Sequence, residues 1–249
     1  MTKIRKEIRS RIVGRERVSL PVASLPRSAI RKISSDSLSE RVYQSLKRDI
    51  ITGVHQPGEA LSEKDLAEKY ASSRTPVREA AVRLQHDNLL KVVPNRGYFI
   101  TKISVQDLVQ LYEYRAAVEC ACAELAATKN STVDLMERLE KLAHTEYKVD
   151  HRESYVHFIT ADTAFHVGIA QLARNQLLLH AVEAVRCHME RIMYAAIDIG
   201  YYGQLPGREH CAILEAIIAR DPRRARQLMY DHIFGSRDKV LQLAGGSNM

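Results

Sequence analysis

The sequence SRTPVREA, residues 73–80, predicts a short helix that begins directly after a turn. Pro76 suits a first helical position, because the amide hydrogen that proline lacks would have no intrahelical partner there. The hydroxyl groups of Ser73 and Thr75 are available to cap the helix. Small and aliphatic side chains recur at the spacing of one buried face, namely Val77, Ala80, Ala81 and Leu84. The segment thus pairs a core-facing stripe with a polar N-terminal end.

A second short helix precedes this one in the sequence. It starts with the capping-box-like sequence SEKD, residues 62–65, and ends near Tyr70, a few residues before the next helix. Further upstream, apolar residues at helical spacing from Leu38 to Ile50 predict a core helix, with Gly53 just past its end. Two short helices joined by a tight turn are typical of a helix-turn-helix.

The residues that follow predict a β-hairpin. Leu89–Val93 is a short apolar strand, PNRG at residues 94–97 is strong turn sequence, and Tyr98–Ile103 alternates as a returning strand. A hairpin in this position is the wing of a winged helix-turn-helix, which we place at residues 37–104.

The N-terminal end of the predicted second helix carries side chains suited to DNA. In a helix-turn-helix this end enters the major groove, and Arg74, Thr75 and Arg78 can bind guanine edges and phosphates. Any one of these arginines could equally belong to a solvated helix face. Their concentration at the start of a helix that follows a turn favours a DNA-reading role.

The remaining residues, 105–249, predict an all-helical bundle. Helical patterns cover about 104–130, 132–149, 152–172, 176–198, 208–220 and 222–243, without a convincing strand pattern. The chain is therefore expected to be mainly α, with an N-terminal winged helix-turn-helix and a C-terminal helical bundle.

Four residues of this bundle have the chemistry of a metal site. Asp162 and His166 are four residues apart within an apolar stripe, and so lie on one helix face. His210 and His232 each lie eleven residues from Asp221, which places them at the same height if the last two helices form an antiparallel hairpin. Three imidazoles and a carboxylate suit a divalent ion such as zinc, nickel or manganese. The alternative is a set of ordinary hydrogen-bonded core residues, because ten histidines supply accidental pairs with acids.

From Pro57 to Tyr98 the chain resembles the GntR family of bacterial regulators. The family pattern appears in order as PGEALSEKDLA at 57–67, SRTPVREA at 73–80 and PNRGY at 94–98. The resemblance implies that Arg74 and Arg78 contact bases or adjacent phosphates. It also implies supporting DNA contacts from residues on the preceding helix, the helix start and the wing, namely Lys64, Ser73, Thr75, Arg96 and Gly97. Gly97 would let the wing tip approach the minor groove.

From about Leu111 to Leu241 the chain resembles the FCD ligand-binding domain of the FadR subfamily. The matching segments include the arginine and glutamate at 115 and 119, DTAFHVGI at 162–169, and EHCAILEAI at 209–217. The resemblance implies a metal held by a complete ligand set, Asp162, His166, His210 and His232. It further implies an effector, commonly a small organic acid or sugar acid in this family. Some related domains bind lipids or amino-acid derivatives instead, so the chemical class of the effector stays open.

Two arginines are candidates for binding the carboxylate of that effector. They are Arg115 on the first helix of the bundle and Arg186 on the helix after Asn175. Both could instead form ion pairs, Arg115 with Glu119 and Arg186 with Glu183 or Glu190. Arg191 would replace Arg186 if the helix phase were different.

Composition limits the class of protein. The net charge of +7 belongs to the front of the chain, because residues 1–32 hold ten Lys and Arg against two acids. We expect residues 1–36 to be a flexible basic extension, either solvated or acting as a DNA-binding arm. The four cysteines lack C-x-x-C spacing, which favours reduced thiols over a zinc knuckle. Without an apolar run of about 20 residues or a secretory signal, a cytoplasmic protein without membrane contact is expected.

These patterns together predict a homodimeric regulator that binds double-stranded operator DNA and is not an enzyme. Repression relieved by a ligand is the commoner arrangement in the resembled family. Two alternatives remain open from the sequence. One is a metal-dependent enzyme in which the Asp/His set activates water, and the other is a nonspecific architectural binder of nucleic acid.

Overall fold

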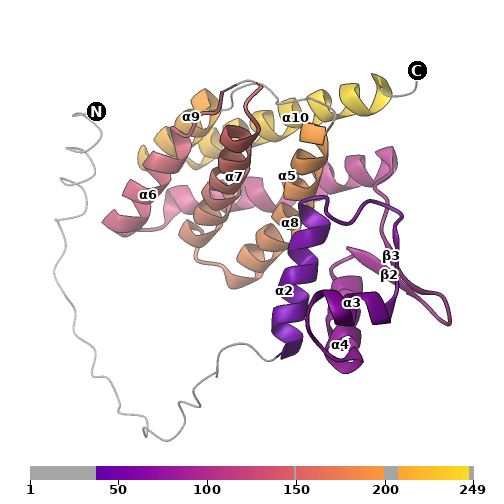
Figure 1. Cartoon of the computed structure of the whole chain (residues 1–249). Helices are drawn as coiled ribbons and strands as arrows, with labels where there is room; N and C mark the ends of the chain where they lie inside the picture. The colour runs from indigo at the N-terminus through magenta and orange to yellow at the C-terminus, as the bar shows by residue number, and fades with distance from the viewer. Residues whose placement is uncertain (1–37, 149, 199–206, 247–249) are drawn as a thin grey trace, which may run out of the picture.

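A computed structural model describes residues 38–148, 150–198 and 207–246 of the chain, and these form two units with separate hydrophobic cores (Figure 1). The architecture is mainly α, as predicted, with one small sheet. The basic extension predicted at 1–36 lies outside the described residues. None of the described helices is both long and apolar enough to cross a membrane.

The N-terminal unit is the predicted winged helix-turn-helix. Its helices and strands are α2 (Leu38–Ile51), β1 (Ala60–Leu61), α3 (Glu63–Lys69), α4 (Arg74–His86), β2 (Leu90–Val93) and β3 (Gly97–Ile100). The antiparallel sheet has the order β1-β3-β2. Tyr98 in the central strand β3 lies opposite Leu61 of β1 on one side and opposite Val92 of β2 on the other. The two-residue strand β1 was not predicted, because a pair of residues is too short to show alternation.

Three local predictions in this unit need correction. The returning strand ends at Ile100 instead of Ile103, because the hydroxyl of Thr101 bonds back to the carbonyl groups of Asn88 and Leu89 and the chain leaves the sheet. Helix α4 begins at Arg74, so Pro76 is its third residue, still within the turn where amide hydrogens lack intrahelical partners. Ser73 occupies the N-cap position but makes no side-chain cap bond.

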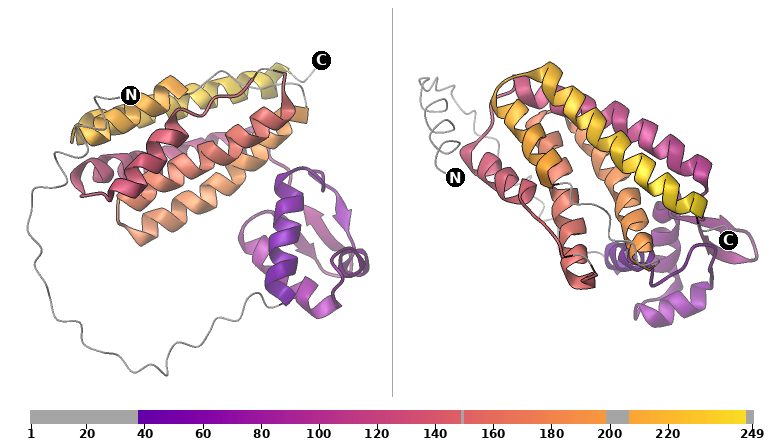
Figure 2. Two further views of the ribbon diagram at one scale, coloured as in Figure 1. Left: turned by 60° about the vertical axis from the view of Figure 1, so that its left-hand side comes forward. Right: turned by 90° about the horizontal axis from the view of Figure 1, so that it is seen from above.

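The C-terminal unit is a bundle of long helices. They are α5 (Val105–Thr128), α6 (Val133–Ala143), α7 (Arg152–Leu172), α8 (Gln176–Asp198), α9 (Gly207–Ile218) and α10 (Pro222–Gly246). Helices α5 and α10 run side by side along the bundle (Figure 2). Ser104 and Asp107 form a reciprocal capping box that fixes where α5 starts, directly after the wing.

Helix α6 is shorter than the predicted 132–149. It ends at Ala143, where His144 caps the last turn through its backbone N–H and its imidazole contacts the carbonyl of Glu140. The chain then turns inward and buries Tyr147 in an aromatic cluster with Tyr155 and Phe158. The helical period in the sequence continues past Ala143, but the helix ends there and Tyr147 packs into the aromatic cluster instead.

Helix α8 joins the two units. It packs against α2 of the winged unit, and its Cys187 lies against the core of that unit. Four residues further along α8, the buried guanidinium of Arg191 donates to both the hydroxyl and the carbonyl of Thr101, in the segment between the wing and α5. The connection between the units is therefore held by a bundle helix as well as by the covalent link.

Candidate metal centre and nucleic-acid interface

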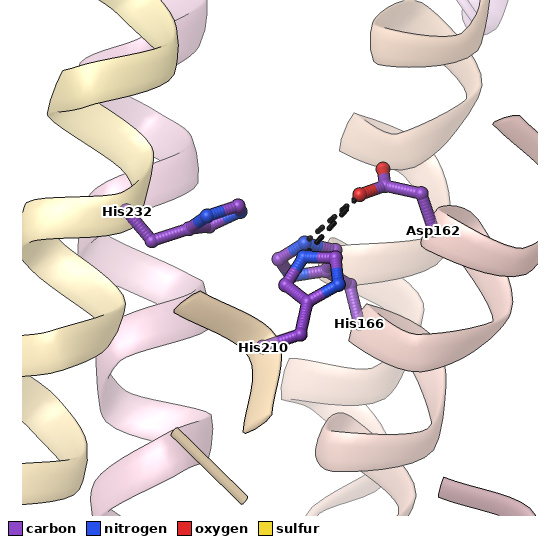
Figure 3. A group of neighbouring side chains, drawn as sticks. All are labelled: Asp162, His166, His210 and His232. Atoms are coloured by element: carbon purple, nitrogen blue, oxygen red, sulfur yellow. Dashed lines mark ion pairs between the residues drawn. The ribbon is translucent and has the colours of Figure 1, made fainter. Parts of the chain in front are cut away.

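The Asp/His cluster consists of Asp162, His166, His210 and His232, and the four side chains point toward one another (Figure 3). Helix α7 supplies the first two, and α9 and α10 supply one histidine each. One potential ligand atom from each residue lies within 4.8 Å of the others. The predicted hairpin of the last two helices is confirmed, with the His210 and His232 ring centroids 4.8 Å apart.

The donor set of this cluster fits a divalent cation. Oδ1 of Asp162 lies 3.4 Å from Nε2 of His210 and 3.8 Å from Nε2 of His166. His210 is 1% exposed, yet its Nε2 makes no hydrogen bond with any described residue. A buried nitrogen without a partner costs free energy, and a metal ion is one group that would satisfy it. Imidazole and carboxylate ligands together suit zinc, nickel and manganese.

Two further carboxylates contact the Nδ1 atoms of two of the histidines, His166 and His232. Oε2 of Glu119 lies 2.6 Å from Nδ1 of His166, and His232 Nδ1 contacts Oε2 of Glu209 at 2.7 Å. A carboxylate on Nδ1 fixes the tautomer in which Nε2 carries a lone pair, and it increases the basicity of that nitrogen. Sequence reasoning assigned neither glutamate this role, although Glu119 was singled out as a partner for Arg115 and Glu209 directly precedes a ligand.

The two predicted effector arginines both lie at the cluster, and both are almost fully buried. Arg115 donates through Nε to Glu119 over 2.8 Å, as the ion-pair alternative predicted, and its Nη2 lies 3.1 Å from Nε2 of His166. Arg186 pairs with Asp162 and not with Glu183 or Glu190, so the partners named in the ion-pair alternative are wrong. The face of α8 that carries Arg186 is turned toward α7, and its partner comes from that helix.

Arg191 does not substitute for Arg186. It points to the interdomain segment at Thr101, five residues further along α8. The structure therefore has the helix phase that was predicted first, in which Arg186 faces the Asp/His cluster.

Burial and charge set the ionisation states at the cluster. Although burial alone would raise the pKa of Asp162, the charge of Arg186 holds it far below its usual range. The pKa of Glu119 is also strongly lowered, because the charge of Arg115 outweighs the effect of burial. Burial lowers the pKa of His166 to about 4 and that of His210 well below its usual value. Ionised carboxylates and neutral imidazoles are the forms that bind metals.

A cavity of about 90 Å³ adjoins the cluster. Asp162, His232 and both arginines are among the residues that line it. The lining also includes apolar side chains from α7, α8 and α10, the rings of Tyr147, Tyr155 and Phe158, and the polar side chains of Glu209, Ser236 and Lys239. A small molecule in this cavity would contact the two guanidinium groups and the side chains of Asp162 and His232 at the same time.

The predicted DNA-reading residues form a separate surface, the recognition end, at the start of α4 and on α3. Arg74 and Arg78 are exposed, and the Arg78 side chain, 64% exposed, donates to Glu63 over 2.8 Å. Lys64 is 70% exposed and lies 3.9 Å from Glu68. Ser73 and Thr75 are exposed beside them, so neither arginine is packed into the protein interior.

The two predicted wing residues lie at the tip of the hairpin. Arg96 is exposed, with its guanidinium carbon 5.9 Å from the centre of the Phe99 ring. Gly97 has a φ of +94°, and a Cβ there would lie 2.7 Å from the carbonyl oxygen of Leu61. The fold itself thus requires glycine at position 97, and its approach to a minor groove stays a prediction.

Comparison with known proteins agrees with both units. Residues 38–100 match the bacterial regulatory proteins of the gntR family, and residues 110–235 match the FCD domain. The HTH-type transcriptional repressor RspR of Escherichia coli is 30% identical over 206 residues, covering 83% of this chain and 90% of RspR.

Two solved structures share the fold. E. coli McbR/YncC has a TM-score of 0.68 at 24% identity, covering 84% of this chain and 99% of its own. A GntR regulator from Rhodococcus sp. RHA1 has a TM-score of 0.67 at 27% identity, with 83% and 99% covered. Taken with the matched residues of both units, these likenesses show that the chain belongs to the GntR family of bacterial transcription regulators and carries an FCD domain.

Proposed function

We propose that this regulator is a repressor whose affinity for operator DNA is set by a small carboxylate bound at or near a divalent metal in the bundle. Residues 37–104 would bind the DNA, and residues 105–249 would bind the effector. The observation that carries the proposal is that Asp162, His166, His210 and His232 lie together, and that Asp162 and His232 line one cavity with the two buried arginines. The repressor assignment is supported by the name of RspR.

Charge balance favours an anionic effector. In the buried set, Arg115 and Arg186 balance Glu119 and Asp162, while burial lowers the pKa values of His166 and His210 and favours their neutral forms. A divalent ion held by Asp162 and the three histidines would bring excess positive charge into a poorly solvated site, and a carboxylate effector would offset it. Zinc, nickel and manganese all satisfy the donor set.

DNA recognition would use the recognition end. The side chains of Arg74 and Arg78 are exposed and could reorient to bind guanine edges or phosphates. An exposed ion pair such as Arg78 with Glu63 is weak and would separate at little cost. Lys64 and the wing residue Arg96 would contact phosphates. We propose that two copies of the chain pair about a two-fold axis, so that their α4 helices enter successive major grooves of a pseudo-palindromic operator.

Helix α8 offers a physical route between the two sites. Its Arg186 bonds a metal-ligand residue, Asp162, and its Arg191 bonds the segment between the units at Thr101. A carboxylate that draws Arg186 away from Asp162 would change the packing of α8 and with it the placement of the winged unit. Such coupling is commonly worth ~1–3 kcal/mol.

One variant tests the two halves of the proposal separately. We expect His210→Ala to lose bound metal and the response to effector while keeping operator affinity within a few-fold, because the cluster lies in the bundle and the recognition end in the winged unit. His157→Ala is the matched control, since His157 is exposed on α7. Metal content is measured by elemental analysis of the purified full chain.

Operator binding is measured on duplexes selected from a random pool, with scrambled duplexes as competitor at physiological salt. We expect the selected duplex to bind about 10³-fold or more tightly than the scrambled one. Equal affinity for the two would favour a nonspecific architectural binder. Full metal occupancy in His210→Ala would contradict the metal site, and hydrolytic turnover that depends on His210 would favour the enzyme alternative.

A further inference from the structure

One buried arginine of the bundle has no carboxylate partner. The other two buried arginines of the described chain, Arg115 and Arg186, each pair with a buried carboxylate. Arg191 is 4% exposed, and its two hydrogen bonds go to neutral groups, the hydroxyl and the carbonyl of Thr101. Its guanidinium forms no ion pair with any residue that the structure describes. Buried charges are normally paired, because an unpaired charge is costly to remove from water.

The guanidinium of Arg191 can bind a further acceptor. A guanidinium has five N–H groups in a planar fork, and the two bonds to Thr101 use one group on each Nη. Burial lowers the pKa of Arg191 below its ordinary value. For Arg115 burial acts in the same direction, but the charge of Glu119 outweighs it and raises the pKa. An oxyanion at the other three N–H groups of Arg191 would supply the missing countercharge and leave the contact with Thr101 in place.

Arg191 lines a cavity at the junction of the two units, here called the junction cavity. Its lining comes from the end of α2 and the turn that follows, from Lys102 and Ile103 in the segment between the units, and from the bundle helices α5 and α8. It shares one lining residue, Ile192, with the cavity beside the Asp/His cluster. An occupant of the junction cavity would therefore contact both units at once without contacting the four residues of the cluster.

The side chains around the junction cavity are mainly aliphatic or cationic. Of its eleven described lining residues, seven are aliphatic or proline, and none carries a carboxylate or a hydroxyl. The polar side chains are those of Gln56, Lys102 and Arg191, and the amide nitrogen of Gln56 already donates to the carbonyl of Gly53. Water could accept from the spare N–H groups of Arg191, but it would bring no countercharge and would gain little from aliphatic walls. The lining instead suits an anion that is attached to an apolar group.

We propose that the junction cavity is a second regulatory site, which binds an amphipathic monoanion, namely a single oxyanion group on an apolar body. The oxyanion would bind Arg191, with Lys102 as a second cation, and the apolar body would lie against the aliphatic side chains of α2 and α8. Because both units line the cavity, an occupant would bias their relative placement and with it the affinity for DNA. This inference goes beyond the proposed function, since it needs no metal at the Asp/His cluster.

The first test separates the charge of the ligand from its apolar body. The probe is 1-anilinonaphthalene-8-sulfonate, and the two reference compounds are N-phenyl-1-naphthylamine, which has the same rings without the sulfonate, and methanesulfonate, which has the sulfonate without the rings. Each is titrated into the full chain in the presence of a chelator, with fluorescence for the dyes and competition for methanesulfonate. We expect the sulfonated dye to bind at least about tenfold more tightly than either reference compound, because bonds to charged groups are worth that much and aliphatic walls add to them.

The second test locates the site with Ala195→Glu and Ala195→Gln. Ala195 is exposed on α8, lines the junction cavity and lies four residues after Arg191, so a carboxylate there would pair with the guanidinium in place of the ligand. We expect Ala195→Glu to weaken binding of the sulfonated dye at least about tenfold, and Ala195→Gln, which has the same size, by less than about threefold. Leu177→Glu is the control for general charge, because Leu177 is 81% exposed on the same helix and does not line the cavity.

The third test links the cavity to DNA binding. Filter binding measures the affinity for a selected operator duplex with and without a saturating concentration of the sulfonated dye. We expect the dye to change this affinity about fivefold or more in the unmodified chain and in Ala195→Gln, and to leave it unchanged in Ala195→Glu.

Each outcome decides the inference. Equal binding of the two dyes would overturn the need for an anion. Equal weakening by Ala195→Glu and either control variant would overturn the assigned cavity, and an operator affinity that ignores the bound dye would overturn the regulatory role. Dye binding that requires metal, or that is lost in His210→Ala and kept in Ala195→Glu, would place the dye at the Asp/His cluster and overturn the junction site while leaving the proposed function intact.

Discussion

The recognition end and the Asp/His cluster contain similar side chains in opposite environments. Arg78 on α4 is 64% exposed and pairs with Glu63, whereas Arg186 on α8 is 1% exposed and pairs with Asp162. Exposed ion pairs contribute little to stability and separate readily. A buried charge that loses its partner is strongly destabilising. Position in the fold thus decides whether an arginine is available to an external ligand or committed to the protein.

This difference teaches what each site can do. The exposed arginines keep their hydration and can exchange a weak partner for DNA at small cost. The buried arginines can release their carboxylates only when another charge replaces them, which would make the proposed bundle site responsive to an anion or a metal. The two proposed roles, reading DNA and sensing a ligand, therefore use opposite degrees of burial for the same residue type.

The largest expected effect is on stability at the buried pair. Arg186→Met leaves the Asp162 carboxylate buried without its main partner, and we expect a loss of about 3–5 kcal/mol in the free energy of unfolding. The matched control is Arg226→Met, because Arg226 pairs with Glu124 at the surface, where both side chains are about half exposed. That variant should lose at most about 1 kcal/mol. Urea unfolding in the presence of a chelator measures the free energy of unfolding of both variants. Equal losses would contradict the difference between the buried and the exposed ion pair.

The next effect is on DNA binding at the exposed end. Arg74→Ala is expected to cost about 1–3 kcal/mol of specific binding, because Arg74 is the first residue of the recognition helix and is exposed. Lys64→Ala is the companion variant. It should weaken binding to all sequences alike and reduce the salt slope of log K by about one. Fluorescence anisotropy across a salt series separates the two, and an unchanged operator affinity in Arg74→Ala would refute its assignment.

The smallest expected effect is on the orientation of a proposed metal ligand, His232. Glu209→Gln removes the carboxylate that contacts Nδ1 of His232, and we expect metal affinity to fall about 10–100-fold. Glu215→Gln is the control, because Glu215 is exposed on the same helix. Competition with a metal-binding dye measures the dissociation constants. Equal weakening by the two variants would show that general surface charge, and not the contact with His232, sets the affinity.

Much of this architecture follows from local sequence patterns. The helical periods, the turn at Pro94 and the capping box at Ser104 depend on residues close in the chain, and each predicted element is present. The convergence of His210 and His232 was also accessible, because Asp221 sits midway between them and fixes the hairpin.

The misses other than the start and the side-chain cap of α4 involve contacts between residues distant in the sequence. The partner of Arg186 is Asp162, 24 residues away, while local spacing suggested Glu183 or Glu190. Tyr147 ends α6 early through contacts with α7, and β1 exists only because β3 pairs with it. The carboxylates of Glu119 and Glu209 support the histidines from other helices, so no spacing rule applies to them.

The contact between Arg191 and Thr101 has a consequence for protein engineering. One of its two acceptors is a main-chain carbonyl, which every residue type provides, and only the second depends on the threonine hydroxyl. Most replacements at position 101 would keep half of the contact, whereas replacement of the arginine removes all of it. A chimaera that grafts this bundle onto a foreign DNA reader could therefore accept a new linker sequence, provided that the linker backbone still passes the guanidinium at the same point.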